Sequence, residues 1–343
     1  MSKSQFPADA KVLAQEMKPT LDALEQGRLK SLARISKGWK KIGLCVLICA
    51  AVAVLILALS SASSSTDPYS NSSIEWGFLV IPVGIIGIIY CAVIHHKYIS
   101  GHNAIYCAVY KEKVIGGMTR LIQPDMTYSP ERGISEQTFM EMGLYSTGID
   151  RYHSEDMFAG KIGKTALMFS EAHAEEKRTS RDSKGRTKTR WVTIFRGLLT
   201  IADFNKEFRS WVTVKPDFAE SAFGWFGRKI QGFSADLVRL ENPDFEKAFV
   251  VHGGDQVEAR YILTPDMQDR LLDLRKWFGD DIRVAFHSSR MHLTIPNSDN
   301  WFEPNIKRSA HDTSQMQMFL RQMSSVFRLV EMLDLNTRIW TKE

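Results

Sequence analysis

Segment 160–165, with the sequence GKIGKT, contains the residue types that hold nucleotide phosphates in a P-loop. In that motif a lysine and a hydroxyl group contact the phosphates and magnesium. The spacing requires another glycine at the position of Phe158, and the segment runs into a strand-like sequence instead of a helix N-terminus that could bind the anion. The sequence therefore predicts a hairpin turn at Gly163-Lys164 and no phosphate site.

Other catalytic and metal-binding patterns are missing from the sequence. It has no G-x-S-x-G nucleophile motif, and its 9 histidines include no H-E-x-x-H pair. The 4 cysteines form no C-x-x-C pair, and Cys45, Cys49 and Cys91 lie in apolar runs, which disfavours a disulfide framework or a structural zinc site. We expect no metal and no cofactor. Binding is favoured over catalysis, because a catalytic site would have to be assembled from residues that lie far apart in the sequence.

Four polar residues at or just after the ends of predicted strands are candidates for lining a small-molecule pocket: Asp203, Asn205, His252 and Asp255. Such positions are equally typical of Asx turns, in which the side chain bonds to nearby backbone. The sequence leaves the pocket and the turn interpretations open.

Positive charge is concentrated in segment 177–190, between two predicted strands. Its seven basic residues are Lys177, Arg178, Arg181, Lys184, Arg186, Lys188 and Arg190, against a single acid. The segment is expected to form a hairpin tip, either simply solvated or bound to anionic lipid headgroups. Nucleic acid is disfavoured, because no aromatic residue alternates with the charges before Trp191.

A second surface candidate is the aromatic segment 218–233. It combines Trp225 and Phe226 with the basic pair Arg228 and Lys229, flanked by glycines. Such a loop could enter the inner leaflet or dock a protein partner. Burial under the sheet is the alternative.

Two uncharged runs can each cross a hydrocarbon core of about 30 Å. They are segments 42–59 (18 residues) and 76–94 (19 residues), joined by a short Ser-rich connection. The pair predicts a transmembrane helical hairpin. Cys45 and Cys49 recur on one face of the first run and are expected to pack against the small residues Gly84, Gly87 and Cys91 of the second.

The charge distribution predicts the orientation of this hairpin. Segment 28–41 carries six Lys or Arg and no acid, whereas segment 60–75 has neither Lys nor Arg. By the positive-inside rule both termini are cytoplasmic. The expected organisation is an N-terminal helical arm (1–41), first span (42–59), external loop (60–75), second span (76–94), juxtamembrane helical linker (95–125) and cytoplasmic domain (126–343). The arm could also pair with a second copy of the chain or with the cytoplasmic domain, or its basic side could lie on anionic headgroups.

The cytoplasmic part alternates between strand and helix patterns without strict β-α repetition. Runs rich in β-branched and aromatic residues predict strands at 165–174, 191–202, 211–214, 249–252, 257–263, 282–286 and 291–295. Helices are expected over 104–123, after the Thr264-Pro265 cap and after Asp312. Short connections favour an antiparallel sheet, so the fold class is α+β with flanking helices.

Several phrases of this domain carry a family resemblance: IGKTALMFSEAHAE, FRGLLTIADFNKEF, FEKAFVVHGGDQVEARYILTP and LDLNTRIW. In this order they resemble the bacterial membrane-protein family known as domain of unknown function number 3137. The resemblance runs from about Tyr128 to the end. It implies a cytoplasmic module anchored in a bacterial inner membrane, and it brings no catalytic residues.

Two functional hypotheses follow from the sequence. The first is a membrane-anchored binding or scaffold module that contacts protein partners or anionic lipid through the basic hairpin and the aromatic segment. The second is an effector domain that binds a small molecule or nucleotide near Asp203, Asn205, His252 and Asp255 and acts on the membrane hairpin.

Overall fold

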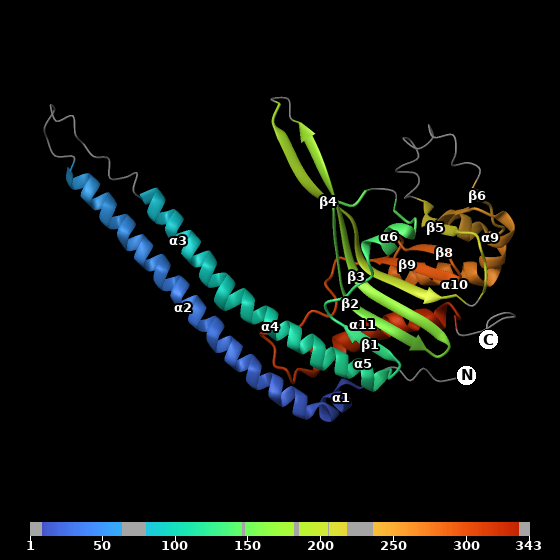
Figure 1. Cartoon of the computed structure of the whole chain (residues 1–343), viewed down its shortest axis with the longest axis horizontal. Helices are drawn as coiled ribbons and strands as arrows, with labels where there is room; N and C mark the ends of the chain where they lie inside the picture. Colours follow the sequence, from blue (N-terminus) through green and yellow to red (C-terminus); the bar gives the residue numbers. More distant parts are fainter. Residues whose placement is uncertain are drawn as a thin grey trace. The chain divides into compact units, whose positions relative to one another are not determined.

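The computed structural model describes residues 9–63, 80–145, 148–181, 185–204, 206–217 and 236–335 (Figure 1). The chain divides into two compact units. The helical unit comprises Met17–Tyr110 and Pro304–Asp312, and the sheet unit comprises Met1–Glu16, Lys111–Glu303 and Thr313–Glu343.

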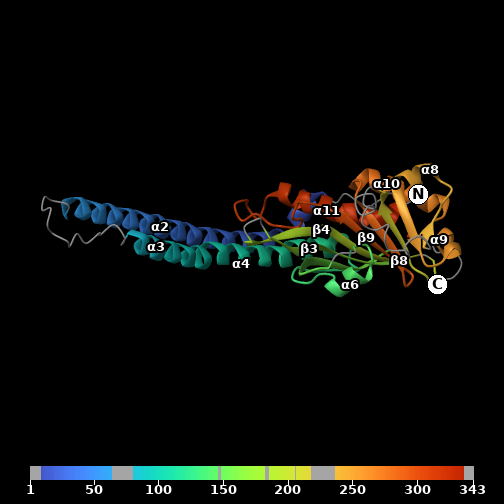
Figure 2. The same ribbon diagram turned by 90° about the horizontal axis from the view of Figure 1, so that it is seen from above.

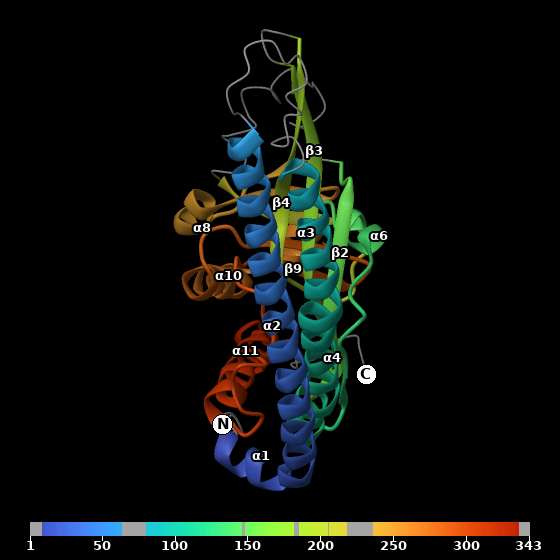
Figure 3. The same ribbon diagram turned by 90° about the vertical axis from the view of Figure 1, so that its left-hand side faces the viewer.

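Two long helices dominate the helical unit. Helix α2 (Lys18–Ser63) has 46 residues and joins the N-terminal arm to the first apolar run without a break. Helix α3 (Val80–Ile94) continues into the π-helical segment η2 (His95–Ser100) and then α4 (Gly101–Tyr110). Helices α2 and α3 lie side by side (Figures 2 and 3). The predicted helical arm that runs into a first long apolar helix is confirmed.

The apolar side chains of these helices face outward. Leu47 on α2 is 69% exposed and Ile88 on α3 is 71% exposed. Both helices contain a stretch long and apolar enough to cross a membrane. The buried share is 0% for the stretch in α2 and 6% for the stretch that begins in α3. A core helix of a soluble domain would instead hide its apolar side chains.

Small residues set the contact between the two helices. A Cβ added at Gly87 would lie 2.6 Å from Cys49 Sγ, and Cys45 Sγ lies 3.9 Å from the Gly87 carbonyl oxygen. The expected packing of these cysteines against Gly87 is therefore confirmed. A Cβ at Gly84 would meet no atom within 4 Å, so that glycine is not part of the close contact.

The loop Pro304–Asp312 is bound to α2 within the helical unit. The Glu25 carboxylate accepts hydrogen bonds from the Ala310 N–H at 2.8 Å and the Ser309 hydroxyl at 3.1 Å. Arg28 pairs with Glu25 at 2.6 Å and donates to the Ile306 carbonyl at 3.1 Å. The hydrogen bond from Arg28 lowers the pKa of Glu25 to about 2, so this carboxylate is ionised at neutral pH. We call this set of contacts the clasp.

The sheet unit is built on one antiparallel sheet of nine strands in the order β1-β2-β3-β4-β9-β8-β5-β7-β6. The strands are β1 (Met126–Ser129), β2 (Arg151–Ile162), β3 (Thr165–Arg181), β4 (Thr187–Asp203), β5 (Val212–Pro216), β6 (Leu237–Val238), β7 (Phe249–Gly253), β8 (Arg283–His287) and β9 (Arg290–Pro296). The helical elements are α1 (Ala10–Glu16), η3 (Lys111–Ile115), α5 (Gly116–Ile122), α6 (Glu136–Glu141), α8 (Pro243–Ala248), α9 (Gln256–Ile262), α10 (Pro265–Phe278) and α11 (Thr313–Met332). The predicted α+β class is confirmed.

Helices cover the two faces of this sheet (Figure 2). On one face, Phe139 of α6 packs with Phe195 of β4 and the buried side chains around it. On the other face, Phe327 of α11 meets Phe169 of β3, which stacks on Phe158 of β2. The alternation of buried and exposed positions along the first half of β3 follows from the period of two in a strand, whereas residues 197–202 of β4 are buried on both faces.

Two predicted turns and caps are confirmed. Strands β2 and β3 are joined at Gly163 and Lys164, where Gly163 has φ = 60°, a conformation that glycine adopts without strain. The GKT segment is therefore a hairpin turn. Thr264 caps α10 through the Met267 N–H, and Gly279 follows its last turn.

One predicted strand is wrong. Segment 257–263, rich in β-branched and aromatic residues, lies in helix α9 (Gln256–Ile262) and the Leu263 that follows it. The Asp255 carboxylate accepts hydrogen bonds from the N–H groups of Val257 and Glu258 and caps this helix. Ala259 and Ile262, three residues apart, are its buried side chains, so helical periodicity and the cap outweigh strand propensity.

Candidate functional site

An irregularity in β2 positions a buried carboxylate. The register between β2 and β3 shifts between Glu155 and Phe158, and Asp156 adopts φ = 56° at this bulge. The Asp156 N–H bonds to the Pro130 carbonyl at 2.9 Å, outside the β2–β3 ladder. Bulges of this kind redirect a side chain, and here the Asp156 carboxylate is fully buried.

Asp156 is held by two donors from different elements. The Tyr128 hydroxyl of β1 donates to its Oδ1, and Lys111 Nζ of η3 lies 2.8 Å from its Oδ2. Burial raises the pKa of Asp156 to about 6, with Lys111 opposing the shift, so the carboxylate is ionised at neutral pH. The same Lys111 ammonium contacts Glu155 at 3.3 Å and Glu303 at 3.0 Å. One buried ammonium group thus faces three carboxylates.

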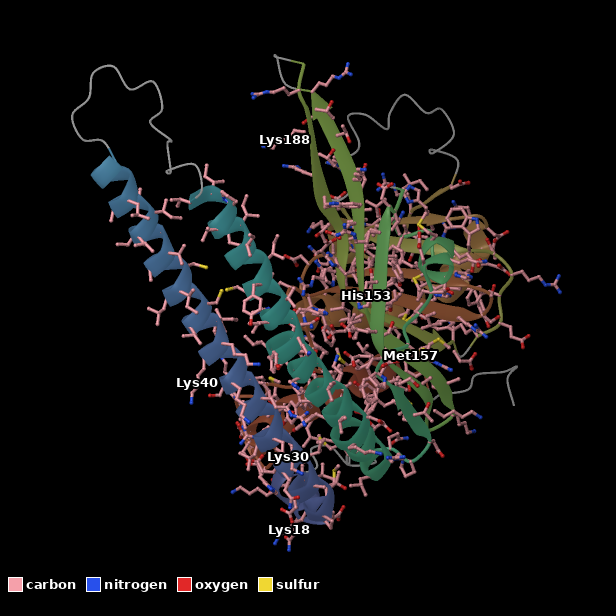
Figure 4. All side chains as sticks on the ribbon, turned by 60° about the vertical axis from the view of Figure 1, so that its left-hand side comes forward. Lys18, Lys30, Lys40, His153, Met157 and Lys188 are labelled. Atoms are coloured by element: carbon pink, nitrogen blue, oxygen red, sulfur yellow. The ribbon has the colours of Figure 1, made fainter. Side chains whose placement is uncertain are left out.

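A pocket of about 120 Å³, here called the polar pocket because most of its lining residues are polar, opens beside this cluster. Its residue Glu171 lies on the same face of β3 as Phe169, which contacts α11. Strand register places its walls in two rows: Glu155 opposite Glu171, and His153 opposite His173. On the neighbouring strand β4, Arg196 lies directly opposite His173. His153, on β2, is labelled in Figure 4 and lines the pocket from that strand. The loop after β9 completes the lining with Asn297, Asp299, Asn300 and Trp301.

Glu171 is the group with the most unusual environment in the pocket. Burial, together with the nearby Asp156 and Glu155 carboxylates, raises the pKa of Glu171 to about 8, although the Trp301 backbone N–H lowers it. Its Oε1 is buried and accepts no hydrogen bond from the described residues. Glu171 therefore carries a proton at neutral pH. Burial also lowers the pKa of His173, which shares a hydrogen bond with Thr193 at 3.2 Å.

The donor set of this pocket does not suit a metal ion. Among the described residues there is no group of three His, Cys, Asp or Glu side chains placed to hold one. The arrangement instead combines a protonatable carboxylate, an aromatic wall at Trp301 and a guanidinium at Arg196.

The residues predicted to line a ligand pocket lie apart. Asp203 ends β4 and His252 lies on β7, and β9, β8 and β5 separate these strands. Four strand spacings of about 4.8 Å put them about 19 Å apart. Asp255 is the N-cap of α9, and Asn205 lies outside the described residues. A ligand site on these four residues stays a prediction, and the structure does not bring Asp203 and His252 together.

The predicted basic hairpin is the outer part of β3 and β4, here called the basic ribbon (residues 177–181 and 187–191). It extends beyond the rest of the sheet in Figure 1, and Lys188 is labelled on it in Figure 4. Arg178 lies directly opposite Arg190, and all ribbon residues are exposed. Its basic members in these strands are Lys177, Arg178, Arg181, Lys188 and Arg190; Arg186 lies in the connection, and Lys184 falls outside the described residues.

The aromatic segment cannot be placed. Trp225, Phe226, Arg228 and Lys229 all lie outside the described residues, so their role stays a prediction.

The cluster of Lys111, Asp156 and Glu171 was not predicted from the sequence. A signal for it exists: Glu155 and Glu171 lie in strand-like runs, where a carboxylate on an inward-facing position is unusual. The pairing of those two runs, which brings the carboxylates together, was not visible in the sequence.

Comparison with known proteins supports the family resemblance. Residues 193–335 match the family model described as "Protein of unknown function (DUF3137)". No curated protein and no solved structure matches the chain. The DUF3137 match runs from β4 through α11, so it includes Arg196 and Trp301 of the pocket. Lys111, Asp156 and Glu171 precede it, as does the phrase IGKTALMFSEAHAE.

Proposed function

We propose that this chain is a multi-pass protein of a bacterial inner membrane, with both termini in the cytoplasm, and that its α+β part is a binding module held at the membrane. The observation that carries the proposal is the outward-facing apolar surface of α2 and α3, which in water would strongly favour aggregation. The six cations of segment 28–41 support the orientation.

The basic ribbon is the contact that we assign to anionic lipid headgroups. Arg178 lies opposite Arg190 and pairs with Glu176 of its own strand at 2.9 Å, so the repulsion between the two cations is only partly offset, and a polyanionic surface would stabilise the pair. Trp191, the one aromatic residue of the ribbon, is covered by the Arg151 guanidinium 3.9 Å from its ring. That stacking disfavours nucleic acid, which would need the ring for a base.

Topology is tested with reporter fusions to the full chain. A reporter that is active only outside the cytoplasm should be silent when fused at Glu343 and active when inserted into segment 64–79. Activity at Glu343 would overturn the orientation.

Headgroup binding is tested on the full chain reconstituted in vesicles. A fluorophore at S180C on the ribbon should be quenched by nitroxide-labelled headgroups in vesicles with phosphatidylglycerol, and much less in neutral vesicles. The variant R178E/K188E/R190E should lose the quenching. Reversal of three other exposed cations, K113E/K247E/K276E, is the matched control and should keep it. Equal quenching in the ribbon variant would exclude the lipid role.

A second candidate function is that of a ligand sensor that acts on the membrane helices. The favouring observation is chain continuity: the loop that lines the pocket at Asn297–Trp301 leads through Glu303, which contacts Lys111, directly into the clasp on α2. A ligand that moves Trp301 would act on the same short segment that Glu25 and Arg28 hold.

A further inference from the structure

The polar pocket of the sheet unit has more carboxylate groups than positive charge to balance them. Lys111 already contacts Asp156, Glu155 and Glu303 at 2.8, 3.3 and 3.0 Å. Glu171 lies opposite Glu155 in the strand register and receives no ion pair of its own among the described residues. Like charges directly opposite on neighbouring strands repel. The facing carboxyl groups of Glu155 and Glu171 therefore require either a proton or another cation.

The other charged groups around Glu171 do not supply that cation in the interior. His173 follows on the same strand face and is kept neutral, because burial lowers its pKa. Arg196 is exposed at the outer side of the pocket, and Asp299 of the β9 loop adds a further carboxylate. His153 lies 3.6 Å from Glu155, but its side chain is 71% exposed.

The size and walls of the pocket define the cation that fits. A cavity of about 120 Å³ holds several water molecules, so the ligand is a small compound with few non-hydrogen atoms. A metal ion lacks a suitable donor group among the described residues. An ammonium group can donate to the unpartnered Glu171 Oε1. Trp301 lines the same space, and tryptophan rings attract cations.

We propose that this pocket binds a small primary ammonium compound, whose nitrogen donates to the Glu171 carboxylate beside Glu155 and Trp301. At neutral pH the empty pocket holds a proton on Glu171, and the bound ammonium replaces it, so one proton is released to solvent for each amine bound. The shared chemistry fits a simple alkylamine or an amino acid, whose carboxylate would reach Arg196.

The inference is tested by calorimetry on the full chain in detergent micelles, with ethylammonium, 1,4-diaminobutane and glycine as probes. Titrations at pH 7 in buffers of different ionisation enthalpy should reveal about one proton released per amine, and titrations at pH 9 should reveal almost none. E171Q should weaken binding at least tenfold and abolish the proton release. E131Q, which changes an exposed carboxylate that does not line the pocket, is the control and should behave as wild type.

Each outcome decides the matter. R196Q should weaken glycine alone if the ligand is an amino acid, and should leave ethylammonium binding unchanged. Absence of binding by every probe at tens of millimolar, binding that E171Q leaves intact, or binding at pH 7 without proton release would each overturn the proposal. E171Q mimics the protonated side chain, so it should fold, and a thermal midpoint at pH 7 that is no lower than that of wild type verifies this. Neither membrane topology nor ribbon contact enters this assay, so it fails independently of the proposed function.

Discussion

At the scale of single residues, the contacts predict the largest loss of stability for a substitution of Lys111. Its side chain is 7% exposed and lies within ion-pair distance of three carboxylates. Burial lowers the pKa of Lys111, but Asp156, Glu303 and Glu155 together raise it above its ordinary value, so the ammonium stays charged.

The substitution K111M should therefore destabilise the sheet unit by about 3 to 5 kcal/mol, because it leaves the buried Asp156 charge without its partner. Chemical unfolding of the detergent-solubilised chain measures this change. K113M removes a cation from the same segment, but its pair with Glu112 is largely exposed, and the free energy of unfolding should change by less than about 0.5 kcal/mol. Similar losses in the two variants would contradict the role of the buried cluster.

Glu171 makes the stability depend on pH in a defined direction. Its pKa is raised from 4.5 to about 8 on folding, so between these values the folded chain binds one proton more than the unfolded chain. Stability therefore declines as pH rises from about 5 to 8, by about 1.4 kcal/mol per pH unit for one proton. Thermal midpoints across this range should fall more steeply for wild type than for E171Q. Parallel pH profiles would show that Glu171 titrates normally.

At the scale of elements, Asp255 has two possible roles, helix cap or ligand-binding residue, and substitutions can distinguish them. Its carboxylate accepts N–H groups of Val257 and Glu258 at 2.8 and 2.7 Å. D255A should lower stability by about 1 kcal/mol, and D255S should restore most of it, because serine caps helices well. Denaturant unfolding of both variants checks this expectation. Equal losses for alanine and serine would contradict the capping role.

Helix α3 offers a matched pair of glycines. G87L forces a side chain against Cys49 Sγ and should destabilise the α2–α3 contact by about 1 to 3 kcal/mol, whereas G84L meets open space. Thermal unfolding in micelles, followed by protease resistance of the hairpin, compares the two. A hairpin that tolerates both leucines would contradict the close contact.

Local sequence signals predicted much of this architecture. The apolar runs, the Thr264 cap and the Gly163 turn depend on neighbouring residues, so the sequence was enough to find them. Segment 257–263 was assigned to a strand on its β-branched and aromatic content, and the helix cap at Asp255 was not recognised. The pocket depends on a bulge at Asp156 and on the register of β2 with β3, which are tertiary properties that no local pattern carries.

At the scale of the whole molecule, the loop Pro304–Asp312 joins β9 to α11 in the chain while belonging to the helical unit. A conformational change in the pocket loop can reach α2 along the chain through this segment. The strength of the clasp therefore limits how freely such a signal could move.

Glu25 sets that strength. Its ion pair with Arg28 is mostly buried, with side-chain exposures of 20% and 10%, and its pKa of about 2 lies below the ordinary value. The clasp is thus fully formed above about pH 4.5 and weakens as pH falls toward 2.

The variant E25Q leaves the Arg28 guanidinium buried without its carboxylate, so the loop should open more often at neutral pH. Trypsin reports this opening, because the loop contains Lys307 and Arg308. We expect cleavage there to accelerate at least tenfold in micelles. D22N is the matched control: it removes the His311 contact at 3.2 Å, whose partners are 41% and 53% exposed, and should change the rate little. If cleavage is unchanged in E25Q, the loop is held by its apolar contacts, and a ligand signal through the clasp loses its physical basis.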